Sequence, residues 1–257
     1  MLDKVILVDD FENKPNNNDS LKIRTAIETY GIKVDLLKID ENIHSYLKNE
    51  SNILIFNLIP LFGNKYSKFI PAYCDLLQIP YTGSGIFAIS SLSSNFYNYI
   101  LKYHKIPFNN QNIKEKYQIS ILGNKDKIIF NTIFVDYEGK SKIVNPSLSL
   151  KIEKIIKKLQ NILKIHDYFT LHLVKPNSNE QLFEILKITL SPDLSETSKF
   201  IEILKLNDLS FNEIIGLIIL NCTIRYGIAI PMTLKQLQTE YFWAKYYYNF
   251  LLQSKSN

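Results

Sequence analysis

The chain has 257 residues, a net charge of +5 and a hydrophobic fraction of 46%, which together predict a folded globular protein with a sizeable core. Its lysines are scattered rather than clustered, which argues against nucleic acid as a partner. The apolar runs are short and interrupted by Lys or Asn, and the N-terminus lacks a signal-peptide pattern, which argues against a membrane protein. Cys74 and Cys222 lie far apart in apolar helical contexts, where free thiols are expected, so we expect a cytoplasmic protein.

The first hundred residues alternate between short apolar strands and amphipathic helices. We expect strands at residues 5–8, 33–39 and 53–58, and helices at 21–30, around 69–77 and in one further segment that ends at Pro107. This alternation predicts right-handed crossovers and a doubly wound parallel sheet, that is, a Rossmann-like α/β domain. Asp9 and Asp10 follow the first strand at the carboxyl edge of that sheet, where such folds bind ligands. They are candidate ligand-binding residues, although acids also commonly solubilise such loops.

After Pro107 the pattern changes to an antiparallel one. We expect strands at residues 117–124, 127–135, 168–174 and 182–190, and helices at 148–165 and 211–226. A last helix at residues 234–252 carries many aromatic side chains, including Tyr241, Phe242, Trp243, Tyr246, Tyr247 and Phe250. One interpretation is a helix that packs back on its own domain. The other is a docking surface for a second copy of the chain or for a protein partner, because aromatic residues are enriched at interfaces.

Three motifs resemble those of one protein family. The segment Ile79–Gly85, with a strand and a helix before it and a helix and an Ile106-Pro107 exit after it, resembles the end of the first domain of D-alanine–D-alanine ligases, which belong to the ATP-grasp superfamily. Leu163–Leu173 and Leu186–Ser195 resemble two strands of the closing domain of that family. The resemblance implies a Rossmann-like (pre-ATP-grasp) domain over residues 1–107, a reduced ATP-grasp-like α+β domain over 108–227 and an added aromatic helical tail over 228–257. It also implies a homodimer, which is common in the family.

The family's magnesium and transition-state residues are replaced in this chain. At the matching positions Thr170 stands for an Arg, His172 for an Asp, Lys187 for a Glu and Thr189 for an Asn. Magnesium prefers oxygen ligands, and a lysine ammonium repels it. Only the nine residues Phe108–Lys116 precede the next strand, too few for the family's ATP-binding lobe, and the chain has no Gly-rich phosphate loop. We therefore expect a pseudoenzyme without catalytic residues, metal or cofactor, which acts by binding, scaffolding or oligomerisation.

Two alternatives stay open. One is an ATP- and magnesium-dependent carboxylate–amine ligase that uses rearranged residues or a lobe from a partner. The other is a sensor that binds a small molecule between the domains, with Tyr81, Thr82, Gly83 and Ser84 as candidate ligand-binding residues beside the two acids. Ser84 also resembles a nucleophile on a turn, but a tight turn that caps the next helix is the favoured interpretation. The four histidines lack metal-site spacing.

Overall fold

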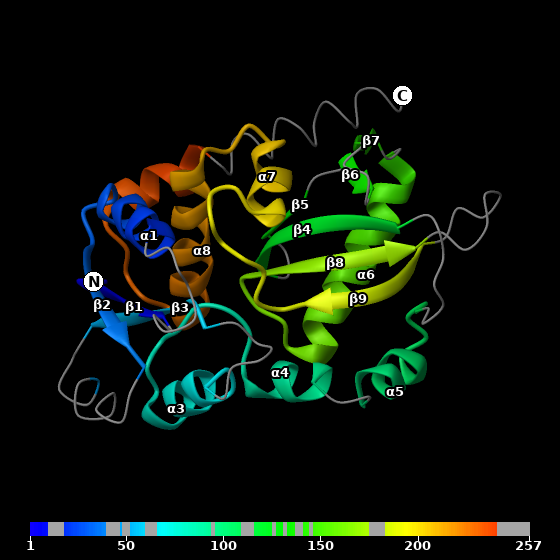
Figure 1. Ribbon diagram of the computed structural model, residues 1–257, viewed down its shortest axis with the longest axis horizontal. Helices are drawn as coiled ribbons and strands as arrows, with labels where there is room; N and C mark the ends of the chain where they lie inside the picture. Colours follow the sequence, from blue (N-terminus) through cyan, green and yellow to red (C-terminus); the bar gives the residue numbers. More distant parts are fainter. Residues whose placement is uncertain are drawn as a thin grey trace.

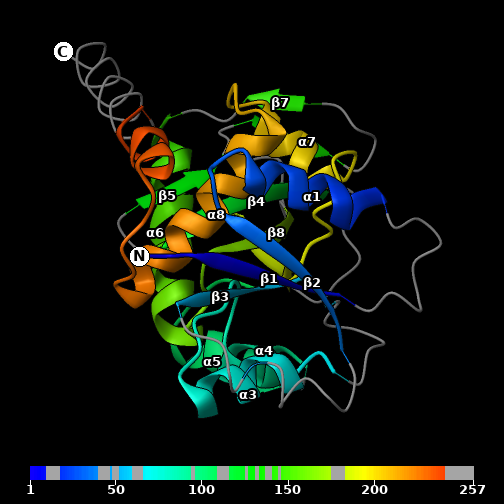
Figure 2. The same ribbon diagram turned by 90° about the vertical axis from the view of Figure 1, so that its left-hand side faces the viewer.

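The computed structural model describes residues 1–9, 18–39, 47, 52–59, 66–93, 96–108, 116–124, 127–130, 133–136, 141–143, 146–174 and 183–240. These residues form a parallel sheet and an antiparallel sheet with helices around them (Figures 1 and 2). Asp10 and the aromatic residues Tyr241, Phe242, Trp243, Tyr246, Tyr247 and Phe250 lie outside the described residues. No helix in the described part of the chain is long and apolar enough to cross a membrane.

The first sheet is parallel, with strand order β2-β1-β3. Its strands are β1 (Lys4–Asp9), β2 (Lys33–Lys38) and β3 (Ile53–Asn57). On the central strand β1, Val5 and Leu7 pack with α1 (Asn18–Glu28), while Ile6 and Val8 pack with α3 (Phe69–Leu77). Both faces of β1 are therefore buried, which explains why its sequence is a continuous apolar run rather than an alternating one. The predicted Rossmann-like class is confirmed.

The Ile79–Gly85 segment runs beside β3 and leads into two short helices. Ile55 of β3 donates its N–H to Pro80 and accepts a hydrogen bond from Thr82, so Tyr81 forms a parallel bridge next to β3. The chain then enters α4 (Ile86–Leu92) and α5 (Phe96–Tyr103). The sequence predicted one helical segment here, and this was wrong. The break falls in a run of serines and an asparagine, residues that favour caps and turns over helix interiors.

The second sheet is antiparallel, with strand order β7-β6-β4-β8-β9 and with β5 also paired to β4. Its strands are β4 (Lys116–Asn124), β5 (Lys127–Phe130), β6 (Ile133–Asp136), β7 (Ser141–Ile143), β8 (Tyr168–Val174) and β9 (Glu184–Thr189). The strand predicted at residues 127–135 is thus two strands. The helix α6 (Pro146–Leu163) covers one face of the sheet through Ile152, Ile156 and Leu159. The change from a parallel to an antiparallel sheet after Pro107 is confirmed.

One buried helix, α8 (Phe211–Tyr226), belongs to a hydrophobic cluster that includes residues of both sheets. It packs against α1 and β4, and α7 (Lys199–Lys205) packs against both α8 and β4. A capping box between Ser210 and Glu213 starts α8, and Gly227 ends it in the left-handed conformation that favours glycine. The chain then runs back to the N-terminus, where Leu2 donates its N–H to the Ala229 carbonyl, and residues 232–240 form a further helix.

Candidate functional site

The four replaced positions lie together on one face of the antiparallel sheet. Thr170 of β8 is directly opposite Thr189 of β9, and His172 is directly opposite Lys187. Because side chains two residues apart on a strand share a face, all four point to the same side, and we call them the strand quartet. The Thr189 hydroxyl oxygen lies 3.4 Å from His172 Nε2. The sequence motif therefore identified a real cluster of side chains.

Strand β4 extends the quartet with two more polar side chains. Ser120 is opposite Thr170, and Gln118 is opposite His172. The hydroxyl groups of Ser120 and Thr170 are buried and have no hydrogen-bond partner among the residues that the structure describes. Burial lowers the pKa of His172 to about 4, and the nearby Lys187 ammonium adds to the shift, so the imidazole is neutral at pH 7.

The quartet does not fit the magnesium ion that the fold family uses. Its members offer two hydroxyls, one neutral imidazole and one exposed ammonium, and no carboxylate. A hard divalent cation selects carboxylate and carbonyl oxygens and is repelled by an ammonium. Within the described residues, no three His, Cys, Asp or Glu side chains lie close enough together to hold a metal ion.

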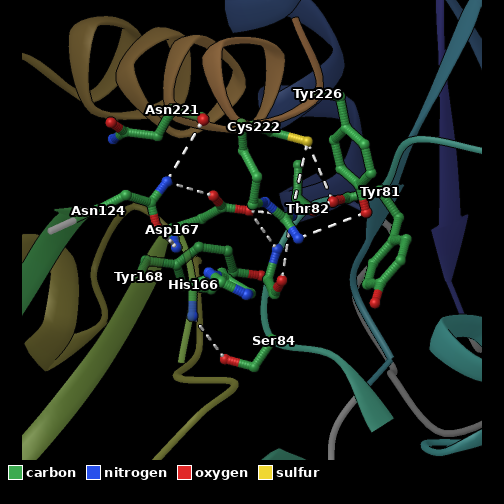
Figure 3. A network of polar contacts seen from close by, with 12 residues as sticks. Tyr81, Thr82, Ser84, Asn124, His166, Asp167, Tyr168, Asn221, Cys222 and Tyr226 are labelled. Atoms are coloured by element: carbon green, nitrogen blue, oxygen red, sulfur yellow. Dashed lines mark hydrogen bonds and ion pairs between the residues drawn. The ribbon is translucent and has the colours of Figure 1, made fainter. Parts of the chain in front are cut away.

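A second cluster, the Asp167 network, joins the Tyr81–Ser84 turn to the antiparallel sheet and to α8 (Figure 3). The Asp167 side chain, which is fully buried, accepts hydrogen bonds from Arg225 Nη2 at 2.8 Å, Asn124 Nδ2 at 2.9 Å and the Gly83 N–H at 2.8 Å. Asn124 Oδ1 in turn accepts the Asp167 N–H at 2.8 Å. Four segments that are distant in sequence thus meet on one carboxylate.

The Tyr81–Ser84 turn contributes mostly backbone groups to this network. The Tyr81 carbonyl accepts hydrogen bonds from Arg225 Nη2 and from the Cys222 thiol, and the Ser84 hydroxyl accepts the His166 N–H at 3.1 Å. Gly83 has φ +88°, a conformation that favours glycine. The turn therefore serves as a structural joint between the sheets, with its side chains at Tyr81, Thr82 and Ser84 buried.

Electrostatics in the Asp167 network are set by burial and by one cation. Burial raises the pKa of the Asp167 carboxyl, while the Arg225 guanidinium, the Asn124 amide and the Gly83 N–H oppose that rise. Burial also lowers the pKa of Arg225, but the Asp167 carboxylate and the other groups around the guanidinium together outweigh burial and raise the pKa, so the guanidinium stays charged. Arg225 lies over the Tyr226 ring, 4.5 Å from its centroid. Burial raises the pKa of the Cys222 thiol well above its usual value, so this thiol is a donor and not a nucleophile.

A pocket lies at the carboxyl end of β3, next to this network, since its lining includes Asn57, whose N–H donates to the Thr82 hydroxyl. It has a volume of about 240 Å³ and lies between the start of α1, the end of β3 and the loop after β9. Its lining residues are Asp19, Ser20, Ile23, Asn57, Leu58, Tyr168, Ser191, Pro192, Asp193, Leu194 and Ser195. Asp193 accepts hydrogen bonds from the N–H and the hydroxyl of Ser195, which shapes the loop. The described lining residues thus include two carboxylates and no cation.

The residues predicted to bind a ligand are not the ones that line this pocket. Asp9, Tyr81, Thr82, Gly83 and Ser84 are all absent from its described lining. Asp9 is buried at the end of β1. Their assignment to a ligand site stays a prediction, and so do the domain boundaries at residues 107 and 227.

Sequence reasoning did not single out Asp167 and Arg225. Asp167 was read only as part of a motif, and Arg225 was not considered. One signal was available, because Arg225 is one of two arginines in a chain whose 30 basic residues are otherwise lysines. Arginine is the basic residue best suited to a partly buried ion pair with several hydrogen bonds.

A parallel three-stranded sheet followed by an antiparallel sheet and a long buried helix makes this chain a mixed α/β protein. No protein-family model and no curated protein sequence matches the chain. Solved structures of D-alanine–D-alanine ligases do match. The enzyme from Bacillus anthracis complexed with ATP is 11% identical, with a TM-score of 0.66 over 87% of this chain and 98% of that chain.

Two further structures give the same result. Another structure of the Bacillus anthracis ligase is 14% identical, with a TM-score of 0.64 over 88% of this chain and 99% of that chain. The ligase from Aeromonas hydrophila is 12% identical, with a TM-score of 0.63 over 84% of this chain and 98% of that chain. The chain therefore has the fold of D-alanine–D-alanine ligases, and the fold predicted from the sequence motifs is confirmed.

Proposed function

We propose that this chain is a pseudoenzyme with the fold of D-alanine–D-alanine ligases, which acts as a binding or scaffold protein and does not catalyse ATP-dependent ligation. The observation that supports this proposal best is the set of residue types in the strand quartet. A ligase of this fold has to neutralise the charge of transferring phosphates, and metal ions supply most of that stabilisation. Thr170, His172, Lys187 and Thr189 provide no carboxylate for such an ion.

The connection between the two sheets supports the same proposal. Phe108 already forms a bridge with Ile185 beside β9, and Lys116 begins β4. Only residues 109–115 separate these two points of the antiparallel part. Seven residues span at most about 25 Å of extended chain, which is too little for a lobe with its own core.

Cys74 and Cys222 are free and buried, as expected in a reducing compartment. On that basis the proposal includes a cytoplasmic location.

Calorimetric titration with Mg-ATP tests the proposal. We expect no binding heat at millimolar nucleotide, with an active D-alanine–D-alanine ligase as the positive control. The triple variant His172→Asp, Lys187→Glu, Thr189→Asn restores the ligand types of the family, and we expect it to bind Mg²⁺ more tightly than the unmodified chain. Micromolar Mg-ATP binding by the unmodified chain, followed by amino-acid-dependent release of ADP, would establish the alternative of a ligase with rearranged or partner-supplied residues.

The pocket at the end of β3 favours a second candidate function, a sensor for a small molecule. Its two carboxylates, Asp19 and Asp193, complement a ligand that carries an amino group, and its position is the usual one for ligands of parallel sheets. A ligand at 100 times its Kd would stabilise the fold by about 2.7 kcal/mol. Thermal unfolding with a panel of amines and amino acids tests this function. The expected result is a rise in Tm that Asp19→Asn abolishes, and an unchanged Tm with every compound would exclude it.

A further inference from the structure

The face of the antiparallel sheet that carries the strand quartet is polar across three adjacent strands. Helix α6 covers the opposite face, where Ile119 of β4 and Phe169 of β8 pack in one cluster with it, and it lies behind these strands in Figure 1. On the quartet's face, cross-strand partners form two rows. The inner row is Ser120, Thr170 and Thr189, and the outer row is Gln118, His172 and Lys187. We call these six side chains the polar rows.

The inner row is buried, and the outer row opens to solvent. One step further along the same face, Tyr168 packs against Phe200 of α7, with 6.1 Å between the ring centroids. Ser120 and Thr170 are 0% and 2% exposed, whereas Lys187, at the other end of the polar rows, is exposed. A small group that enters from the side of Lys187 therefore has the inner row beneath it.

Two hydroxyls of the inner row lack a hydrogen-bond partner within the part of the chain that the structure describes. They are Ser120 Oγ and Thr170 Oγ1, and both atoms are buried. A buried hydroxyl without a partner is unfavourable, and native proteins usually complete such a group with water, an ion or a ligand. The inner row is therefore suited to a group that accepts hydrogen bonds.

The charge of the outer row determines which kind of group fits. An ammonium such as that of Lys187 donates three hydrogen bonds and accepts none. Its cross-strand partner His172 has a neutral imidazole, and none of the other polar-row side chains is a carboxylate. A ligand with negatively charged oxygens supplies both a countercharge for the ammonium and acceptors for the hydroxyls.

The spacing of the quartet suits a small oxyanion. Neighbouring strands lie about 4.8 Å apart, and residues two apart on one strand are separated by about 6.7 Å. Thr170, Thr189, His172 and Lys187 thus stand at the corners of a rectangle of about 5 by 7 Å. An oxyanion above the centre of this rectangle is within reach of all four side chains.

We propose that the polar rows bind a small oxyanion, such as phosphate or the phosphoryl group of a metabolite, without a divalent metal ion. Its oxygens accept hydrogen bonds from the Lys187 ammonium, from the Thr170 and Thr189 hydroxyls and from His172 when Nε2 carries the ring proton. The residues that replace the family's acids thereby form a site for an anion instead of a cation. The inference uses the same replacements as the proposed function, but it concerns binding without metal or nucleotide, so the Mg-ATP titration and the test below can fail independently.

Titration with inorganic phosphate in the absence of divalent metal, followed by two-dimensional ¹⁵N NMR, tests the inference. Sodium chloride at matched ionic strength corrects for screening. We expect saturable shifts of the β8 and β9 amides with a millimolar Kd. Lys187→Met should raise this Kd about tenfold or more, the effect of losing one hydrogen bond from a charged donor. Lys151→Met is the matched control and should leave the Kd unchanged, because Lys151 is exposed on α6, which covers the opposite face.

Two further variants and one further ligand sharpen the test. Thr170→Val keeps the shape of the side chain and should weaken phosphate binding without changing the far-UV circular dichroism spectrum. The triple variant His172→Asp, Lys187→Glu, Thr189→Asn reverses the charge of the site and should lose phosphate binding. Glycerol 3-phosphate distinguishes the sources of the oxyanion, because tighter binding than inorganic phosphate indicates a phosphorylated metabolite and equal or weaker binding indicates free phosphate.

The inference is wrong if tens of millimolar phosphate cause no saturable shift, since the inner hydroxyls are then completed by water alone. It is also wrong if Lys187→Met and Lys151→Met have the same effect on the Kd. Phosphate binding by the unmodified chain that requires added Mg²⁺ would overturn it as well, in favour of a metal site.

Discussion

Removing the guanidinium of Arg225 leaves the fully buried Asp167 carboxylate without a countercharge. Its remaining donors are the Asn124 amide and the Gly83 N–H, both neutral. Breaking a buried pair from one side costs about 3–5 kcal/mol, because the remaining charge stays desolvated. The lost contact with the Tyr226 ring adds about 0.5–1 kcal/mol. We therefore expect Arg225→Ala to lower the free energy of unfolding by about 4 kcal/mol near pH 7.5.

The pH dependence of this deficit separates the orphaned charge from simple loss of packing. Burial already raises the pKa of Asp167 in the intact protein, and removing Arg225 takes away the strongest opposing effect. A raised folded-state pKa means that the folded variant binds a proton more readily than the unfolded chain does. Stability then increases as pH falls toward the unfolded pKa, by up to about 1.4 kcal/mol per pH unit. The deficit of Arg225→Ala relative to the unmodified protein should therefore shrink between about pH 7.5 and pH 5.

Urea unfolding followed by far-UV circular dichroism at the two pH values measures this deficit. Arg24→Ala is the matched control, because Arg24 forms an exposed i,i+4 pair with Glu28 and should contribute about 0.5 kcal/mol or less at both pH values. A second control, Arg225→Met with Asp167→Asn, removes both charges and should recover part of the loss. A deficit that is the same at both pH values, or no larger than that of Arg24→Ala, would refute the reasoning.

Three further predictions follow from single features. Because burial lowers the pKa of His172 to about 4, its folded form resists protonation, so stability should fall by about 2.5 kcal/mol from pH 7.5 to 4.5, and His172→Asn should remove that part of the pH dependence in urea titrations. A Cβ at Gly216 would lie 2.6 Å from the Tyr30 ring, so Gly216→Ala should destabilise the protein but stabilise the Tyr30→Ala variant by about 1 kcal/mol in thermal unfolding. Cys74 and Cys222 are buried with raised pKa values, so a thiol reagent should label them only in urea, and rapid labelling of the native protein would contradict this.

The predictable parts of this fold are those fixed by short-range patterns. The apolar run at residues 5–8 predicted a strand buried on both faces, and β1 is such a strand. The bounds of the helix predicted at 211–226 are confirmed, and a capping box at its start and a C-terminal glycine at its end explain them. The prediction of a single helix before Pro107 was wrong. The polar residues near the break favour caps and turns, whereas the apolar residues around them have the spacing of a helix, so the two signals disagree.

The candidate site likewise has one part that short-range sequence patterns predict and one part that they do not. The strand quartet was predictable, because its four members lie two residues apart on two strands whose motifs are local. The Asp167 network was not predictable, because its residues are separated by 43 to 144 positions and meet only after both sheets have formed. A Gly-Ser turn after a parallel strand suits a ligand loop and a structural joint equally well. The distinction depends on whether the backbone groups of the turn already form hydrogen bonds within the protein. Here the Tyr81 carbonyl accepts hydrogen bonds from Arg225 and Cys222.

The Asp167 residue and the polar face around Thr170 differ in how fully their polar groups are paired, and this difference can be measured, although Arg225 Nε in the Asp167 network is also buried without a partner among the described residues. Each polar group of Asp167 has a partner, whereas the buried hydroxyls of Ser120 and Thr170 have none among the described residues. An unpaired buried hydroxyl costs about 1–3 kcal/mol, so Thr170→Val, which keeps the shape, should raise the free energy of unfolding by about 1 kcal/mol in urea. Thr189→Val is the matched control, because the Thr189 hydroxyl has His172 nearby and its removal should not stabilise the protein. A loss of stability in Thr170→Val would mean that this hydroxyl is hydrogen-bonded to water, and that the face is hydrated where a ligase would bind its metal.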